Sequence, residues 1–265
     1  MALADIRTIA TLAMVLGAAS PAADGPAFEV VSIREVPRDA PPLLRDPSFD
    51  PFLPGGQFID PRTTVLFMIM FAFDIHTDVY LTGLPEWARY QAFSVAAKPP
   101  DGFPRLPSDE NREQMCAMLR EMLASRFQLK LHTETREERT LKLEVPHGGL
   151  KIKAVDPPAP PEKEGFVNMA AGDGGGRMIA RKATMASMAT ALTVILRRPV
   201  LDATGLKDYY TFDVKWSGPG EGGLGVEGLS ALMSALEDLF GLRLTSVTAP
   251  VKYWVVDHVE HPTPN

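Results

Sequence analysis

Met118-Leu-Arg-Glu-Met-Leu-Ala-Ser-Arg-Phe-Gln-Leu-Lys-Leu131 is the stretch that decides the fold, because its pattern occurs a second time. Leu232-Met-Ser-Ala-Leu-Glu-Asp-Leu-Phe-Gly-Leu-Arg-Leu244 repeats its apolar positions at a constant shift of 113 residues, counted from 119 to 232. In both stretches the apolar residues before the phenylalanine have helical spacing, and those after it alternate with polar residues. This predicts a helix followed by a strand. The recurrence indicates an internal duplication.

The duplication extends upstream of these two stretches. Gly55–Ile59 and the helix-like segment Val65–Ile75 align with Gly175–Ile179 and the helix-like segment Met185–Ile195. Each half then carries a Gly-Leu turn and an aromatic strand, at Gly83 and Phe93 in one half and at Gly205 and Phe212 in the other. Each unit therefore reads as strand, helix, two strands around a glycine turn, helix and closing hairpin.

The closing hairpins are predicted from alternation. Phe127–His132 and Thr140–Val145 alternate apolar and polar residues, and the charged residues 134–139 between them are interpreted as a turn. Arg243–Val247 and Val251–Val256 show the same pattern in the second half. We therefore predict an α+β fold made of two tandem repeats, each a small antiparallel sheet covered by two helices.

Proline and glycine mark the expected domain boundaries. Residues 156–174 contain Asp-Pro-Pro-Ala-Pro-Pro and a glycine cluster, so we expect a linker there. The first unit is then expected at residues 24–155, with Phe28–Val36 as a leading strand, and the second at residues 175–265. This division accounts for the whole chain after its N-terminal segment.

Residues 1–23 have the order of a secretory signal. The apolar run Thr8–Ala19 is too short to cross a bilayer as a helix, and it is followed by small residues. The sequence therefore predicts a secreted or periplasmic protein with no membrane span in the mature chain. Because Asp5 offsets the charge of Arg7, an ordinary amphipathic N-terminal helix remains the alternative.

Composition and charge exclude several classes of function. The 265-residue chain has a formal net charge of -6 and no basic cluster of the kind that follows a phosphate backbone, so we expect no nucleic-acid partner. Cys116 is the only cysteine, which excludes an intramolecular disulfide and a thiolate cluster. His258 and His261 lie three apart and would point to opposite faces of a strand, unless the strand ends there as Pro262 suggests. Because two histidines fall short of the three protein ligands that a catalytic site normally uses, we expect no metal site. We expect no cofactor either, because the glycine cluster at 172–176 lacks the Lys-Ser/Thr of a phosphate loop.

Few residues qualify for a ligand site. The turn Asp202-Ala-Thr-Gly-Leu206 carries two side-chain oxygens, from Asp202 and Thr204, and Tyr209 follows it. We nominate Asp202, Thr204, Tyr209 and His258 as binding residues, with a purely structural turn as the alternative for residues 202–206. The serine-hydrolase motif Gly-x-Ser-x-Gly is absent, so no catalytic residue is nominated.

The order of segments resembles a family of exported proteins of unknown function known as the soil-associated acidobacterial family. The matching stretches are Phe28–Ile33, Gly83–Trp87 with Phe93–Lys98, Met118–Leu131, Arg198–Leu206 with Tyr210–Asp213, and Val255–Asp257 with Pro262–Asn265. The resemblance covers nearly the whole mature chain and implies no catalytic residues. It implies occasional fusion to membrane metallopeptidase sensors. The order of elements is more distantly similar to the short N-terminal modules of secretins and TonB-dependent receptors.

The resemblance and the duplication together favour an exported binding or sensing module that recognises an envelope protein or a small ligand. The alternative is a secreted hydrolase with a non-standard site between the two repeats, drawing on Asp202, Tyr209 or His258. A pocket that holds a base near a nucleophile would favour the hydrolase. An exposed sheet edge or apolar patch would favour the binding module.

Overall fold

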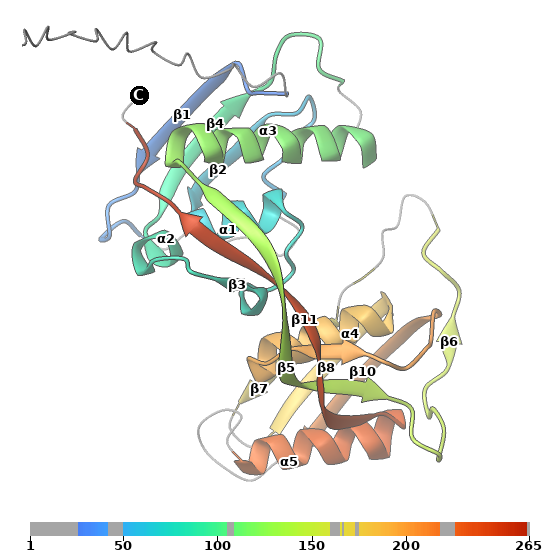
Figure 1. Ribbon diagram of the computed structural model, residues 1–265. Coiled ribbons are helices and arrows are strands. Elements are labelled where there is room, and N and C mark those ends of the chain that lie inside the picture. The colour runs from blue at the N-terminus through green and yellow to red at the C-terminus, as the bar shows by residue number, and fades with distance from the viewer. Residues whose placement is uncertain are drawn as a thin grey trace, which may run out of the picture.

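The computed structural model describes residues 26–41, 50–104, 109–159, 165, 167–172, 175–217 and 226–263. The expected signal segment 1–23 lies outside these residues. The described chain forms a mixed α+β fold with three sheets, which confirms the predicted fold class. Two halves lie at the two ends of a long two-stranded ribbon (Figure 1).

The first half is built on the antiparallel sheet β1-β4-β2, formed by Val30–Glu35, Phe93–Lys98 and Phe58–Thr63. Helices α1 (Val65–Ala72), α2 (Glu86–Tyr90) and α3 (Asp109–Phe127) bury its inner face. Thr64 begins α1 because its hydroxyl accepts a hydrogen bond from the Phe67 amide at 3.1 Å. A one-turn helix η1 (Asp78–Tyr80) leads into the short strand β3 (Leu81–Thr82).

The second half is built on the antiparallel sheet β6-β10-β8-β7, formed by Ala154–Val155, Tyr209–Ser217, Gly175–Ala183 and Val167–Gly172. Helices α4 (Met185–Leu196), α5 (Val226–Ala235) and η2 (Leu236–Phe240) pack on it, and β9 (Val200–Asp202) follows α4. Thr184 begins α4 as Thr64 begins α1, with its hydroxyl accepting from the Ser187 amide at 3.3 Å.

The ribbon corrects the predicted closing hairpins. Residues 130–144 form one strand, β5 (Lys130–Glu144), and residues 243–258 form another, β11 (Arg243–His258). The two strands pair antiparallel with each other over their whole length, from Arg243 beside Glu144 to His258 beside Lys130. The charged residues 134–139 therefore lie within a strand and not in a turn, because a ribbon with one face in solvent accommodates them.

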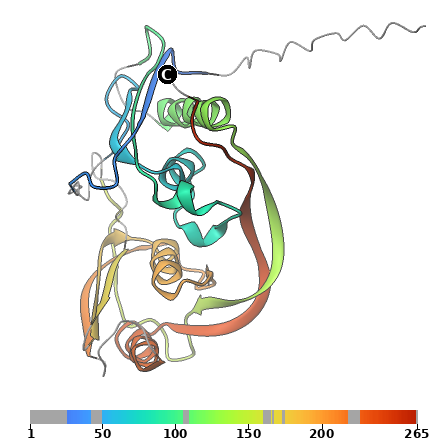
Figure 2. The same cartoon turned by 90° about the vertical axis from the view of Figure 1, so that its left-hand side faces the viewer.

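The two halves exchange strands through this ribbon. At one end of the ribbon, Leu129 just before β5 and Val256 of β11 belong to the first core. At the other end, Leu143 of β5 and Leu244 of β11 belong to the second core. Short parallel strands complete the central sheet β3-β11-β5-β9. Figure 2 shows each half as a sheet on one side, helices in the middle and the ribbon on the other side.

The order of elements is similar in both halves. The middle strand β4 has β1 and β2 as neighbours, and β10 has β6 and β8. The duplication itself stays a prediction, as do the domain boundaries at residues 155 and 175. One difference from the expected linker 156–174 is that part of it forms β7, which pairs with β8 from Val167 beside Ala180 to Gly172 beside Gly175.

Candidate functional site

A groove of about 760 Å³ runs between β7 and α4 in the second half. It is lined by residues of β7 and of α4, by residues just before each of these elements, and by His76 of the first half. Helix α4 packs directly against β7, which places the groove along the margin of the sheet. A groove between a sheet margin and a helix offers an extended chain both hydrogen-bonding groups and an apolar wall.

Strand β7 is the last strand of its sheet, so one of its two sides has no strand neighbour among the described residues. The Gly165 amide donates to the Lys182 carbonyl at 3.2 Å, and Val167 beside Ala180 and Met169 beside Met178 have the same register. In an antiparallel pair, alternate residues direct both backbone groups to the partner. The N–H and C=O groups of Val167 and Met169 thus face β8, and those of Asn168 face the open side.

The residues that the structure describes in β7 include none of the types that usually protect an open edge. Edge strands in natural proteins are usually shielded by charged residues or proline. The described part of β7 reads Val-Asn-Met-Ala-Ala-Gly over residues 167–172, with neither a charge nor a proline. Val167 is buried under the sheet while Asn168 is exposed. Asn168, whose backbone groups face the open side, is therefore an exposed residue in a stretch without the usual edge protection.

The wall of the groove is a helix without charge. Residues 185–196 read Met-Ala-Ser-Met-Ala-Thr-Ala-Leu-Thr-Val-Ile-Leu, and a helix that is uncharged all round is normally buried all round. Met188 and Leu192 do face the core, but Ala186 is exposed and Val194 is 47% exposed, both in the groove. Part of the apolar surface of α4 is left uncovered where it borders β7.

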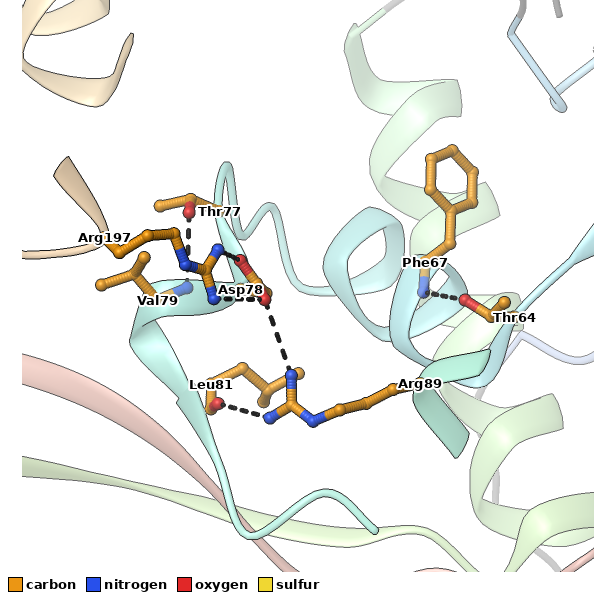
Figure 3. Close-up of polar contacts among 8 residues, drawn as sticks. All are labelled: Thr64, Phe67, Thr77, Asp78, Val79, Leu81, Arg89 and Arg197. Atoms are coloured by element: carbon orange, nitrogen blue, oxygen red, sulfur yellow. Dashed lines mark hydrogen bonds and ion pairs between the residues drawn. The ribbon is translucent and has the colours of Figure 1, made fainter. Parts of the chain in front are cut away.

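An ion-pair network fixes the first half against the end of α4 (Figure 3). The Arg197 guanidinium donates to both carboxylate oxygens of Asp78, at 2.6 and 3.0 Å, and Arg89 lies 3.6 Å from the same carboxylate. Hydrogen bonding to Arg197 lowers the pKa of Asp78 below its usual value. Nearby, the hydroxyls of Tyr80 and Thr193 lie 3.5 Å apart. These contacts hold the segment that carries His76 beside the groove.

A second, smaller cavity of about 410 Å³ lies where η1 and β3 face the ribbon. Tyr253 donates a short hydrogen bond to the Glu138 carboxylate there, and the Arg136 guanidinium lies 4.9 Å from the Tyr253 ring centre. Burial and this hydrogen bond raise the pKa of Tyr253. The lining carries both signs of charge, and its arginines bind partners outside the cavity, Arg136 to Glu134 and Arg197 to Asp78. This mixture of charges selects no ligand class.

Two of the nominated residues lie together in a turn. The Asp202 carboxylate accepts from the Thr204 amide at 3.0 Å and from the Thr204 hydroxyl at 2.7 Å, and the Thr204 hydroxyl accepts from the Leu206 amide at 3.2 Å. Gly205 has a φ of 70°, in the left-handed region that glycine adopts without strain. These bonds are what the structural alternative for residues 202–206 requires.

The other two nominated residues lie elsewhere. Tyr209 begins β10 and pairs with Val155. His258 lies beside Lys130 at one end of β5, whereas Asp202 lies beside Leu143 at the other end. Thirteen residues of strand separate these two points, which is roughly 40 Å at the usual rise. The structure does not bring Asp202 and His258 into one site.

The C-terminal histidines have separate partners. His258 Nε2 lies 2.9 Å from Glu260, while His261 stacks on the Trp87 ring at 3.9 Å and lies 3.1 Å from the Gln91 side chain. Among the described residues, no group of three His, Cys, Asp or Glu side chains could hold a metal ion. None of the helices described is long and apolar enough to span a membrane.

Sequence reasoning missed the groove. Two signals pointed to it: the helix 185–196 has no charge on any face, and residues 167–172 form an uncharged extended stretch beside a glycine cluster. The segment 185–195 was used only as the counterpart of 65–75 in the duplication, and residues 167–172 were included in the linker.

Comparison with known proteins gives a family and no function. Residues 67–259 match the model of the family described as "Protein of unknown function (DUF3738)". The chain belongs to this family. This confirms the expectation of an uncharacterised family. Searches of curated proteins and of solved structures gave no match.

Proposed function

We propose that this DUF3738 protein is a binding module that takes up an extended polypeptide segment as an additional strand beside β7. The observation that carries the proposal is the open side of β7, where the backbone groups of the exposed Asn168 face away from β8 and a groove of about 760 Å³ adjoins. The described residues of β7 include no charge and no proline. Strand addition of this kind supplies affinity through backbone hydrogen bonds and selectivity through side-chain contacts with the neighbouring helix.

The same proposal includes export of the chain. The apolar run Thr8–Ala19 and the small residues after it support a signal segment, so the module would meet its partner in the periplasm or outside the cell. A partner with an extended, accessible segment is then an envelope or secreted protein. Recognition of such a segment fits a sensing role as well as a structural one.

The decisive experiment removes one backbone donor. Asn168→Pro deletes the N–H that faces the open side and leaves the bonds from Val167 and Met169 to β8 in place, because proline is tolerated on an edge strand. Asn168→Ala is the matched control, since it removes the same side chain but keeps the N–H.

The probe is a large array of random octapeptides capped at both ends. We expect the wild type and Asn168→Ala to bind a common subset of spots, and Asn168→Pro to lose that subset while keeping its melting temperature within a few degrees. Equal binding by Asn168→Pro and Asn168→Ala, or the absence of any bound spot with the wild type, would overturn the proposal.

A further inference from the structure

The residues that line the groove indicate the chemistry of the polypeptide segment that binds there. This inference rests on the proposed function. The described residues that line it include no Asp, Glu, Lys or Arg, and His76 is the one titratable side chain among them. They are His76, Gly165, Val167, Asn168, Met169, Thr184, Ala186, Ser187, Thr190, Ala191, Val194 and Ile195. A charge on a bound segment would lose water there and find no opposite charge in the wall.

The middle of the wall is made of small and β-branched side chains. Thr190 and Ala191 are half-buried at the centre of α4, and the Thr190 hydroxyl donates back to the Ala186 carbonyl at 3.1 Å. This bond satisfies the hydroxyl proton within the helix, so the hydroxyl is not held out as a donor for a ligand. The wall therefore offers van der Waals contact more than polar recognition.

Two charged groups beyond the end of α4 are paired with each other outside the groove. Asp78 and Arg197, at the end of α4, bind each other through two hydrogen bonds. His76 has its side chain 67% exposed and lies 4.0 Å from Asp74, so it stands at the solvent margin of the groove. Neither the pair nor His76 neutralises a charge placed opposite Thr190.

We propose that the occupant is an extended polypeptide segment of a partner that is uncharged over the residues opposite Val167–Met169, with small or β-branched side chains facing α4. These are the residues of β7 that line the groove, and at about 3.3 Å per residue they span roughly 10 Å. The match is one of charge: an uncharged wall and an uncharged strand edge select an uncharged segment.

The test uses the same capped octapeptide array, sorted by charge. The spots bound by the wild type should be enriched in sequences with no Asp, Glu, Lys or Arg in their four central positions. Placing Lys or Asp at the centre of a bound peptide should lower its binding affinity about tenfold or more. Bound spots that show no dependence on charge would overturn the inference and leave strand addition standing, whereas an array without bound spots would overturn the proposed function.

A charge placed in the wall gives the reciprocal test. Thr190→Asp should lower the affinity for uncharged peptides about tenfold and shift selection toward peptides with a central Lys. Thr190→Asn, which introduces the uncharged isostere of Asp, should bind the same peptides as the wild type. Met233→Asp, on α5 at a position 37% exposed and outside the lining set, controls for added charge. Unchanged selection by Thr190→Asp would contradict the assignment of this wall to the bound segment.

A second copy of the chain is the competing occupant. Its β7 is itself uncharged, so two copies could pair edge to edge about a two-fold axis. Sedimentation of the wild type alone distinguishes the cases: a monomer over the concentrations used with the array supports a partner segment. A wild-type dimer together with a monomeric Asn168→Pro variant would overturn the proposal of a partner segment in favour of self-association.

Discussion

Phe127 and Phe240 each end a helix and turn the chain toward the ribbon. They are 0% and 1% exposed, and each packs edge to face on a phenylalanine of the neighbouring sheet, Phe93 at 5.7 Å and Phe212 at 4.8 Å between ring centres. Both residues therefore connect helix, sheet and ribbon in their own half. This is the position at which the sequence pattern changes from helical spacing to alternation.

Replacing either phenylalanine by alanine should be costly. We expect Phe127→Ala and Phe240→Ala each to lower the free energy of unfolding by about 3 to 5 kcal/mol, because each leaves a cavity in a packed core. Urea unfolding followed by circular dichroism measures this. Leu239→Ala, at a position 44% exposed beside Phe240, is the control and should change stability by about 0.5 kcal/mol or less. If Phe127→Ala lowers the free energy of unfolding no more than Leu239→Ala does, Phe127 does not lie in a packed core.

Asp78 makes the contact between the halves sensitive to acid. Its pKa is lowered in the folded protein by hydrogen bonding to Arg197, so its contribution to stability is present above the usual aspartate value of 3.8 and is lost as the pH falls through the lowered value. Asp78→Asn should therefore cost about 1 kcal/mol near neutral pH.

The difference between wild type and Asp78→Asn should shrink toward zero in acid. Urea midpoints of both proteins across the acid range test this, with Asp101→Asn as a control at a surface pair whose carboxylate is 91% exposed. A difference that is constant with pH would mean that Asp78 acts through packing and not through its charge.

At the scale of elements, local pattern identified most segments but not their partners. The segments at Val65 and Met185 are helices as predicted, because each has apolar spacing and a capping threonine before it. The prediction of closing hairpins was wrong because β5 pairs with β11, which lies about a hundred residues away in the sequence. Alternation predicts a strand but does not indicate which other strand pairs with it. The charged residues 134–139 were interpreted as a turn because solvent-exposed strand and turn have similar composition.

The candidate site was harder to predict than the fold. The nominated residues Asp202 and Thr204 were recognised as turn formers, and their mutual hydrogen bonds agree with that role. The groove depends on which strand is last in the sheet, and that is decided by tertiary packing. The uncharged stretch 167–172 is compatible with a strand, but its sequence does not indicate which of its sides has no strand neighbour among the described residues.

The ribbon register can be tested by cross-linking. Thr135 and Lys252 lie opposite each other with exposed side chains, and opposite residues in antiparallel strands have Cα separations within the range of a disulfide. We expect Thr135→Cys with Lys252→Cys, in a Cys116→Ala background, to form a disulfide under mild oxidation.

A mismatched pair provides the control for this cross-link. Thr135→Cys with Thr248→Cys should stay reduced, because Thr248 lies opposite Arg139, four residues further along β5. Non-reducing gel mobility and mass spectrometry report both outcomes. Cross-linking of the second pair alone would require a different register.

At the scale of the whole molecule, the exchanged strands make the halves interdependent. Val256 of β11 completes the first core and Leu143 of β5 completes the second. If a protease site is inserted between residues 160 and 164 and cleaved, the two fragments should stay associated through size-exclusion chromatography.

Neither fragment should fold when it is expressed alone, because each would expose the core surface that the other fragment covers. Co-expression should restore a soluble pair with the circular dichroism spectrum of the intact chain. A first fragment that unfolds cooperatively by itself would show that the strand from the other half is dispensable.

Export is the second prediction at this scale. Expressed in a bacterium with its own N-terminus, the protein should lose about twenty residues and be found outside the cytoplasm, as expected for a short apolar signal segment. Mass spectrometry of the periplasmic fraction measures the new N-terminus, and a variant with Leu12→Asp and Val15→Asp should stay inside. A full-length product in the cytoplasm would contradict the proposed location.

The exchange of β5 and β11 also constrains the order of events during synthesis. When β5 leaves the ribosome its partner strand does not yet exist, so the first half can collapse but cannot close until Val251–Val256 has been made. Pairings this distant in sequence carry a large loop-closure entropy and slow the folding of a domain. A chain that is slow to close stays competent for threading through a translocation channel, and it completes its structure only after the last strand has arrived.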